Sequence, residues 1–223
     1  MIKDIKLPSY SKKEEKLNVI THVIGIGLGV IVFFINVIFA IIKNMNFIET
    51  FSLIVYSLCM IVLYSISSIY HGLRQEKYKK IFRVIDHSTI YLLIAGTYTP
   101  ICFMPLKGTT IGMISLLVVW IGAAIGILLN AFLFNKKITS IVSMLLYVIT
   151  GWIVIFGLND VIKFWGVQGF VWTLIGGLIY TIGIAFYALG KQKPYRHTIW
   201  HIFVVLGSLI QFLGIFFEII LIY

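Results

Sequence analysis

The chain has 223 residues, of which 60% are hydrophobic and only 12% are charged, and its mean hydropathy is +1.03. Soluble domains carry roughly a quarter of charged residues, so this composition excludes an ordinary soluble protein and indicates one embedded in a membrane. The formal net charge of +10 would suit a nucleic-acid-binding protein, but the positions of the basic residues give that charge a different explanation.

The predicted elements are all helices that are long enough to cross a bilayer, for which about 20 apolar residues suffice. In chain order, the predominantly apolar runs are 19–42, 47–70, 84–105, 110–130, 138–158, 168–190 and 198–222. We therefore predict an all-α integral membrane protein, a bundle of seven transmembrane helices that forms one domain over residues 1–223. Residues 1–18 form a short polar segment, and run 19–42 is longer than the apolar core of a cleaved signal peptide.

The basic residues indicate which side of the membrane each loop faces. Fifteen of the 18 lysines and arginines lie before the first run or in the second, fourth and sixth loops, whereas Lys43, Lys107 and Lys163 lie in the others. The positive-inside rule then places the N-terminus in the cytoplasm and the C-terminus outside. This explains the basic excess without a nucleic-acid partner, and the same residues suit contact with anionic lipid headgroups of the cell membrane.

With this topology, all five histidines and one aspartate approach the same leaflet. Residues four apart share a helix face, so His197 and His201 can bind one ion. Histidine pairs are also found in hydrated interfaces, and for these two the preceding basic stretch KQKPYR fits that alternative. The polar residues that converge are His22 in the first run, Ser67 and His71 in the second, Asp86 and His87 in the third, and His197 and His201 in the seventh.

A zinc site is the chemistry that these residue types favour. A catalytic Zn²⁺ is commonly held by three protein ligands and a water molecule, and His71, His197 and His201 would supply three nitrogens. Asp86 could orient or deprotonate the water, and Ser67, one turn deeper than His71 at about 6 Å, could bind the water or a substrate carbonyl.

Each of these assignments has a structural alternative. A carboxylate at membrane depth is costly and is usually paired or functional, and Arg83, one turn before Asp86, could be its ion-pair partner. His71 precedes a basic loop and could lie in the hydrated interface. His87 points away from Asp86 and is expected either to pack or to support the ligands, and the same two alternatives apply to His22.

Four segments, EEKLNVITHVIG, SSIYHG, RVIDHSTIYLLIAGTYTP and RHTIWH, resemble signature segments of the bacterial hemolysin III family. That family belongs with the progestin and adiponectin receptors and, more distantly, with the alkaline ceramidases. The resemblance spans essentially the whole chain and implies seven helices, a cytoplasmic N-terminus and an intramembrane zinc site. It places the zinc ligands at His71, His197 and His201, the aspartate close to the metal at Asp86, and the family's serine at Ser67.

The resemblance leaves the activity open, because the family name implies cytolysis whereas the ceramidase-like relatives hydrolyse a lipid amide. A zinc-held water beside an aspartate at acyl-chain depth favours hydrolysis of a lipid amide or ester, since the metal lowers the pKa of the water and polarises the carbonyl. We therefore expect a zinc-dependent hydrolase with a membrane lipid as substrate or ligand. The alternatives are a cytolysin and a sensor of membrane state that holds structural zinc.

Overall fold

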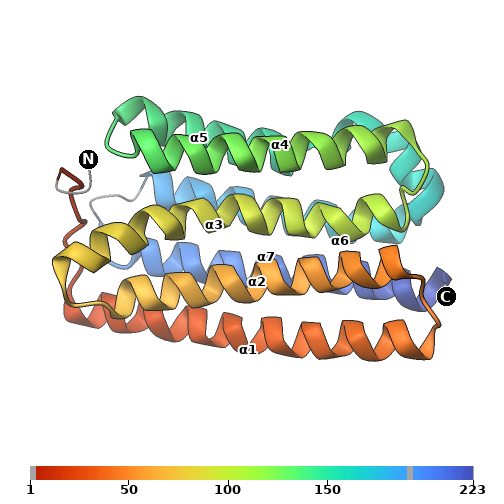
Figure 1. The fold of residues 1–223 in the computed structure, drawn as a ribbon, viewed down its shortest axis with the longest axis horizontal. Helices are drawn as coiled ribbons and strands as arrows, with labels where there is room; N and C mark the ends of the chain where they lie inside the picture. The colour runs from red at the N-terminus through yellow and green to blue at the C-terminus, as the bar shows by residue number, and fades with distance from the viewer. Residues whose placement is uncertain (1–3, 190–192, 223) are drawn as a thin grey trace.

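The computed structural model describes residues 4–189 and 193–222, and almost all of them are helical. The long helices run side by side, with the two chain termini at opposite ends of the bundle (Figure 1). The prediction of an all-α protein is confirmed. In chain order the elements are α1 (Lys12–Ile42), α2 (Phe47–Gly72), α3 (Glu76–Phe103), α4 (Thr110–Leu133), α5 (Lys137–Gly151), the 3₁₀-helix η1 (Ile153–Gly157), α6 (Leu158–Leu189) and α7 (Arg196–Ile222).

Helix α1 begins earlier than the apolar pattern predicts, because a capping box starts it at Lys12. The Ser11 Oγ atom accepts a hydrogen bond from the Glu14 backbone N–H at 3.2 Å, and the Glu14 carboxylate accepts one from the Ser11 N–H at 2.9 Å. These bonds satisfy backbone donors that the first turn leaves free. Residues 12–18 of the polar segment are therefore helical, which brings their polar side chains onto the same helix as His22.

Five helical stretches in the described residues are long and apolar enough to cross a membrane: α1, α2, α4, Lys137–Ala188 and Arg196–Glu218. Helix α3 is long but too polar to meet this criterion, since it carries several threonines and tyrosines. It packs between α2 and α4, and its residues Tyr91, Thr97 and Tyr98 are buried (Figure 1). These three polar side chains of α3 therefore face protein rather than lipid.

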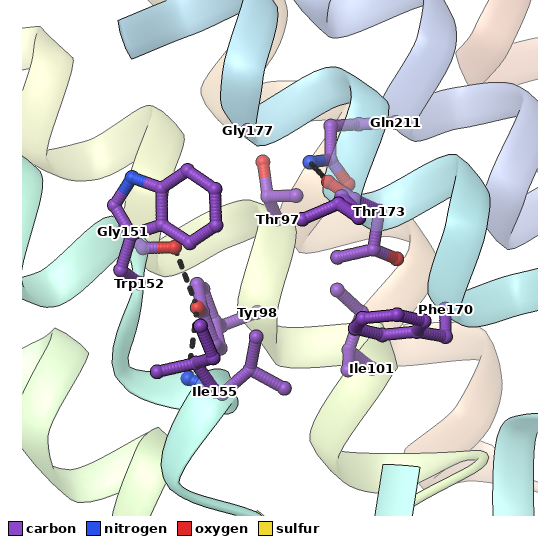
Figure 2. Close-up of a pocket in the computed structure, with 12 residues that line it drawn as sticks. Thr97, Tyr98, Ile101, Gly151, Trp152, Ile155, Phe170, Thr173, Gly177 and Gln211 are labelled. Carbon is purple, nitrogen blue, oxygen red and sulfur yellow. Dashed lines mark hydrogen bonds between the residues drawn. The ribbon is translucent and has the colours of Figure 1, made fainter. Parts of the chain in front are cut away.

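The predicted boundaries of the fifth and sixth runs are wrong. Helix α5 ends at Gly151 rather than near 158, and the Tyr98 hydroxyl of α3 lies at the break (Figure 2). This hydroxyl donates a hydrogen bond to the Gly151 carbonyl at 2.8 Å and accepts one from the Val154 N–H at 3.4 Å. Backbone groups within a bilayer must be satisfied by protein, so Tyr98 makes the interruption tolerable. Helix α6 begins at Leu158 and is itself broken at Gly166, where φ is +77° and glycine is favoured.

Close packing of α1, α2 and α7 sets the relative heights of these helices. A Cβ atom on Gly25 would lie only 2.6 Å from the Tyr64 ring, so α1 and α2 approach as closely as they do because this residue is glycine. The Tyr64 and Tyr180 hydroxyls each lie 2.7 Å from Ser208 Oγ, and the Tyr64 hydroxyl also donates to the Val204 carbonyl at 3.2 Å. These contacts hold α2, α6 and α7 in a register that brings their polar ends together.

Candidate metal centre

Three histidine nitrogens converge at one end of the bundle. His71 lies in the last turn of α2, and His197 and His201 lie in the first two turns of α7. The Nε2 atom of His197 is 3.1 Å from Nε2 of His71 and 3.0 Å from Nε2 of His201. His71 and His201 are 3% and 1% exposed, which argues against a merely hydrated interface for them. The three side chains form a cluster that could hold a metal ion.

The hydrogen bonds on the far side of two rings determine which nitrogens are free to bind a cation. Nδ1 of His71 lies 2.6 Å from the Glu15 carboxylate, and Nδ1 of His201 lies 3.3 Å from the Asn18 carbonyl. Nδ1 of His71 also lies 3.3 Å from the Asn18 side-chain nitrogen, and Nδ1 of His201 lies 3.3 Å from the Thr21 hydroxyl. The shorter contact with the Glu15 carboxylate favours a proton on Nδ1 of His71, and the Asn18 carbonyl favours one on Nδ1 of His201, so that the Nε2 lone pairs face the cluster. Facing lone pairs repel one another unless a cation lies between them. Nitrogen ligands around a tetrahedral zinc ion are about 3.3 Å apart, so the donor set fits such an ion.

A layer of α1 residues supports the cluster, and the sequence reasoning missed it. Glu15 bridges His71 and Lys79, whose Nζ atom is 2.6 Å from Glu15 Oε1. Asn18 accepts a hydrogen bond from the Thr198 hydroxyl at 2.5 Å and so ties α1 to α7. The spacing of Glu15, Asn18 and His22 places them on one helix face, and this pattern was the available signal. Hydrogen-bonded carboxylates behind metal-binding histidines orient the rings and increase their basicity.

Asp86 and Ser67 line a small cavity beside the cluster, of about 40 Å³, together with His197 and His201. The Ser67 hydroxyl is buried and interacts with the Asp86 carboxylate. A site of roughly 10–15 Å³ accommodates one water molecule, so this cavity has room for water next to the histidines. The structure therefore brings together all five residues that the sequence analysis selected as ligands or catalytic groups.

The alternative pairing of Asp86 with Arg83 is wrong. Among the described residues no ion pair joins them; the Arg83 Nη1 atom instead donates a hydrogen bond to the Lys6 carbonyl, and its guanidinium lies 5.3 Å from the centre of the Phe134 ring. One helical turn separates Arg83 from Asp86, but the N-terminal segment supplies a closer acceptor. Asp86 lines the small cavity, and the hydrogen bond of Arg83 goes to the N-terminal segment instead.

The other two histidines form walls of the same cavity. His22 stacks on His201 with ring centres 3.7 Å apart and planes 12° from parallel, and it is buried. His87 packs its ring near Phe134 and Tyr187, at 5.2 and 6.4 Å. Neither belongs to the converging nitrogens, so His22 restrains a candidate ligand by stacking and His87 shapes the cavity.

The segment before α1 covers the open side of the cluster. The Tyr10 ring stacks on His197 at 5.1 Å with an interplanar angle of 18°. Nδ1 of His197 has no hydrogen-bond partner in the described part of the chain, so stacking is the main restraint on this ring. Burial raises the pKa of the Tyr10 phenol, which therefore remains neutral. The Tyr195 N–H donates to Glu14 at 2.8 Å and ties the connection before α7 to α1.

Comparison with known proteins shows that the residues of the candidate metal centre lie in a region that matches a known family. Residues 10–212 match the family described as "Haemolysin-III related". The chain is 36% identical over 211 residues to "Hemolysin-3 homolog" of Bacillus subtilis, covering 93% of this chain and 95% of that protein. It is 36% identical over 208 residues to "Hemolysin-3" of Bacillus cereus, covering 93% of each. Human "Monocyte to macrophage differentiation factor" is 25% identical over 169 residues, covering 72% of this chain and 67% of that protein.

Proposed function

We propose, from the premise that this chain belongs to the hemolysin III family and is a multi-pass membrane protein, that it is a zinc-dependent hydrolase of a membrane lipid amide or ester. The observation that carries the proposal is the convergence of three histidine nitrogens beside a cavity lined by Asp86 and Ser67. Three neutral imidazoles with one adjacent carboxylate form the donor set of a hydrolytic zinc site rather than of a closed structural one.

The proposed topology has seven crossings, with the N-terminus in the cytoplasm and the histidines in the inner leaflet. The five apolar stretches support it, as does α3, whose polar residues Tyr91, Thr97 and Tyr98 are buried between other helices. The break at Gly151 and η1 lets Lys137–Ala188 contribute two crossings in place of one. The basic residues concentrate at the end that carries the histidines, as the positive-inside rule requires.

In the proposed mechanism each residue has a distinct task. His71, His197 and His201 would hold the zinc ion, which when bound lowers the pKa of water and polarises a carbonyl. Asp86 accepts the proton of the attacking water and passes it to the leaving group, as a general base and then a general acid. The buried Ser67 hydroxyl donates a hydrogen bond to the substrate carbonyl oxygen. Ile90, Ile184 and Val204 give the same cavity apolar walls that suit an acyl chain.

The decisive experiment is metal analysis followed by product analysis. We expect about one zinc per chain in protein purified in detergent without chelators, and loss of zinc in His71→Ala and in His197→Ala/His201→Ala. Asp86→Asn should retain zinc and lose lipid hydrolysis, measured by mass spectrometry of the released fatty acid. Absence of zinc from the wild type would reject the metal centre. Wild-type turnover in Asp86→Asn would reject the proposed base.

The name of the Bacillus cereus relative, "Hemolysin-3", favours cytolysis as a second candidate function. The purified chain should then release dye from liposomes, and a wild type that releases none would reject this function. A third candidate, a membrane sensor with structural zinc, predicts bound metal but no lipid product. The product analysis distinguishes it from the hydrolase.

A further inference from the structure

A second and larger cavity, of about 820 Å³, lies at the same end of the bundle. We call it the vestibule; it is bounded by the segment before α1, the turn between α4 and α5, and the start of α7. The N-terminal segment and the α4–α5 turn lie together at that end (Figure 1). Five residues line both the vestibule and the small cavity beside the metal centre: His87, Met144, Tyr147, Tyr187 and His197. The vestibule is therefore the approach to the candidate metal centre, and its volume lies within the range of small-molecule sites.

The vestibule is strongly basic. Its acidic residues are Asp4 and Glu14; Glu14 already accepts hydrogen bonds from Ser11 and Tyr195, and Asp4 has interactions of its own. In the part of the chain that the structure describes, none of the basic lining residues forms an ion pair with an acidic side chain. The six basic residues that line it are Lys6, Arg83, Lys136, Lys137, Lys193 and Arg196.

Topology alone does not account for this arrangement. The positive-inside rule requires basic residues on one face of the membrane, but it does not require them around one cavity. Lys13, Lys16 and Lys77 satisfy the rule at the same end without lining the vestibule. Unpaired cations from four separate segments repel one another, so their convergence around a cavity indicates a site for an anion.

Arg83 is more enclosed than the four lysines of this set. It is half-buried, its guanidinium lies against Phe134, and one of its nitrogens is held by the Lys6 carbonyl. A guanidinium whose orientation is restrained in this way suits bidentate binding of phosphate oxygens, and flexible lysines around it add charge.

We infer that the vestibule binds the phosphate of a lipid headgroup. The lipid lies with its phosphate among the basic residues and its acyl linkage toward the small cavity. The assignment of this lipid as a substrate rests on the proposed hydrolase function, whereas the binding of phosphate does not. The inferred ligand class is an anionic glycerophospholipid.

The test measures equilibrium binding to the full chain in a non-ionic detergent, by anisotropy of a fluorophore on the acyl chain. The probes are phosphatidic acid and diacylglycerol with identical chains. We expect phosphatidic acid to bind at least about tenfold more tightly, and Lys136→Gln/Lys137→Gln and Arg196→Gln each to reduce that advantage severalfold. The control matched to the double variant, Lys13→Gln/Lys16→Gln, removes the same two charges at the same end and should leave the advantage intact.

Equal affinity for the two probes would overturn the inference, and so would an equal loss in the control variant. Glycerol phosphate serves as a competitor for the phosphatidic acid probe. Weak competition supports a lipid ligand. If glycerol phosphate displaces the probe at a concentration equal to that of the probe, the lipid assignment is overturned. Repeating the titration with Asp86→Asn separates binding from hydrolysis, because this variant should bind phosphatidic acid without hydrolysing a lipid. If the wild type binds phosphatidic acid but hydrolyses no lipid, the hydrolase proposal alone is rejected. Zinc-dependent turnover of a neutral lipid without phosphatidic acid binding rejects the vestibule site alone.

Discussion

Glu15→Gln tests the support that α1 gives to the candidate metal centre. The carboxylate lies 2.6 Å from His71 Nδ1, its side chain is only 19% exposed, and that of His71 is fully buried. Glutamine retains an acceptor for Nδ1, so the tautomer persists and the variant removes mainly the negative charge. Loss of a residue that hydrogen-bonds a metal-binding histidine typically costs about 10–100-fold in metal affinity, equivalent to about 1.4–2.7 kcal/mol.

The Lys79 ammonium, 2.6 Å from the other Glu15 oxygen, modifies this expectation. In the glutamine variant this cation loses its anionic partner near the site and further disfavours a bound cation. We therefore expect Glu15→Gln/Lys79→Met to recover part of the lost affinity, as a double-mutant cycle would measure.

The assay is competition for zinc between the purified protein and a chromophoric chelator. Glu14→Gln is the matched control, because Glu14 is on the same turn but its carboxylate binds Ser11 and the Tyr195 N–H and no histidine. Thermal unfolding of the metal-free proteins checks that both variants fold. Zinc affinity within about twofold of wild type in Glu15→Gln, or an equal loss in Glu14→Gln, would refute the reasoning.

Three further predictions concern packing, one at the break after α5 and two around the centre. Tyr98→Phe removes the hydroxyl that satisfies the break after α5 and should lower the stability to thermal unfolding by about 1–3 kcal/mol, with unchanged zinc content; an unaltered melting temperature would contradict this role. Gly25→Ala forces a methyl group into the Tyr64 ring and should cost about 1–3 kcal/mol and weaken zinc binding, whereas Gly27→Ala, which meets nothing, should do neither. Tyr10→Ala frees His197 and should speed the removal of zinc by a chelator, while Tyr10→Phe keeps the stacking and should behave as wild type.

Hydropathy located the helices whose apolar residues face lipid. The runs predicted at 47–70, 110–130 and 198–222 differ from α2, α4 and α7 by three residues or fewer at either end. The pattern failed where a distant residue decides the backbone. The break after Gly151 depends on a hydroxyl from α3, 53 residues earlier in the chain, and no local periodicity signals it.

The candidate site followed from the sequence where spacing along one helix and a shared depth in the membrane were sufficient, as for His197, His201 and His71. Contacts between segments decided the rest. Glu15 meets His71 across 56 residues, and Arg83 turns to the Lys6 carbonyl rather than to the nearby Asp86. Composition and spacing by themselves determined that this chain lies in a membrane and carries histidines at one depth, because those properties depend on residue type and helical period. Only the tertiary structure decided which polar groups meet, because hydrogen bonds between helices depend on their rotation and register.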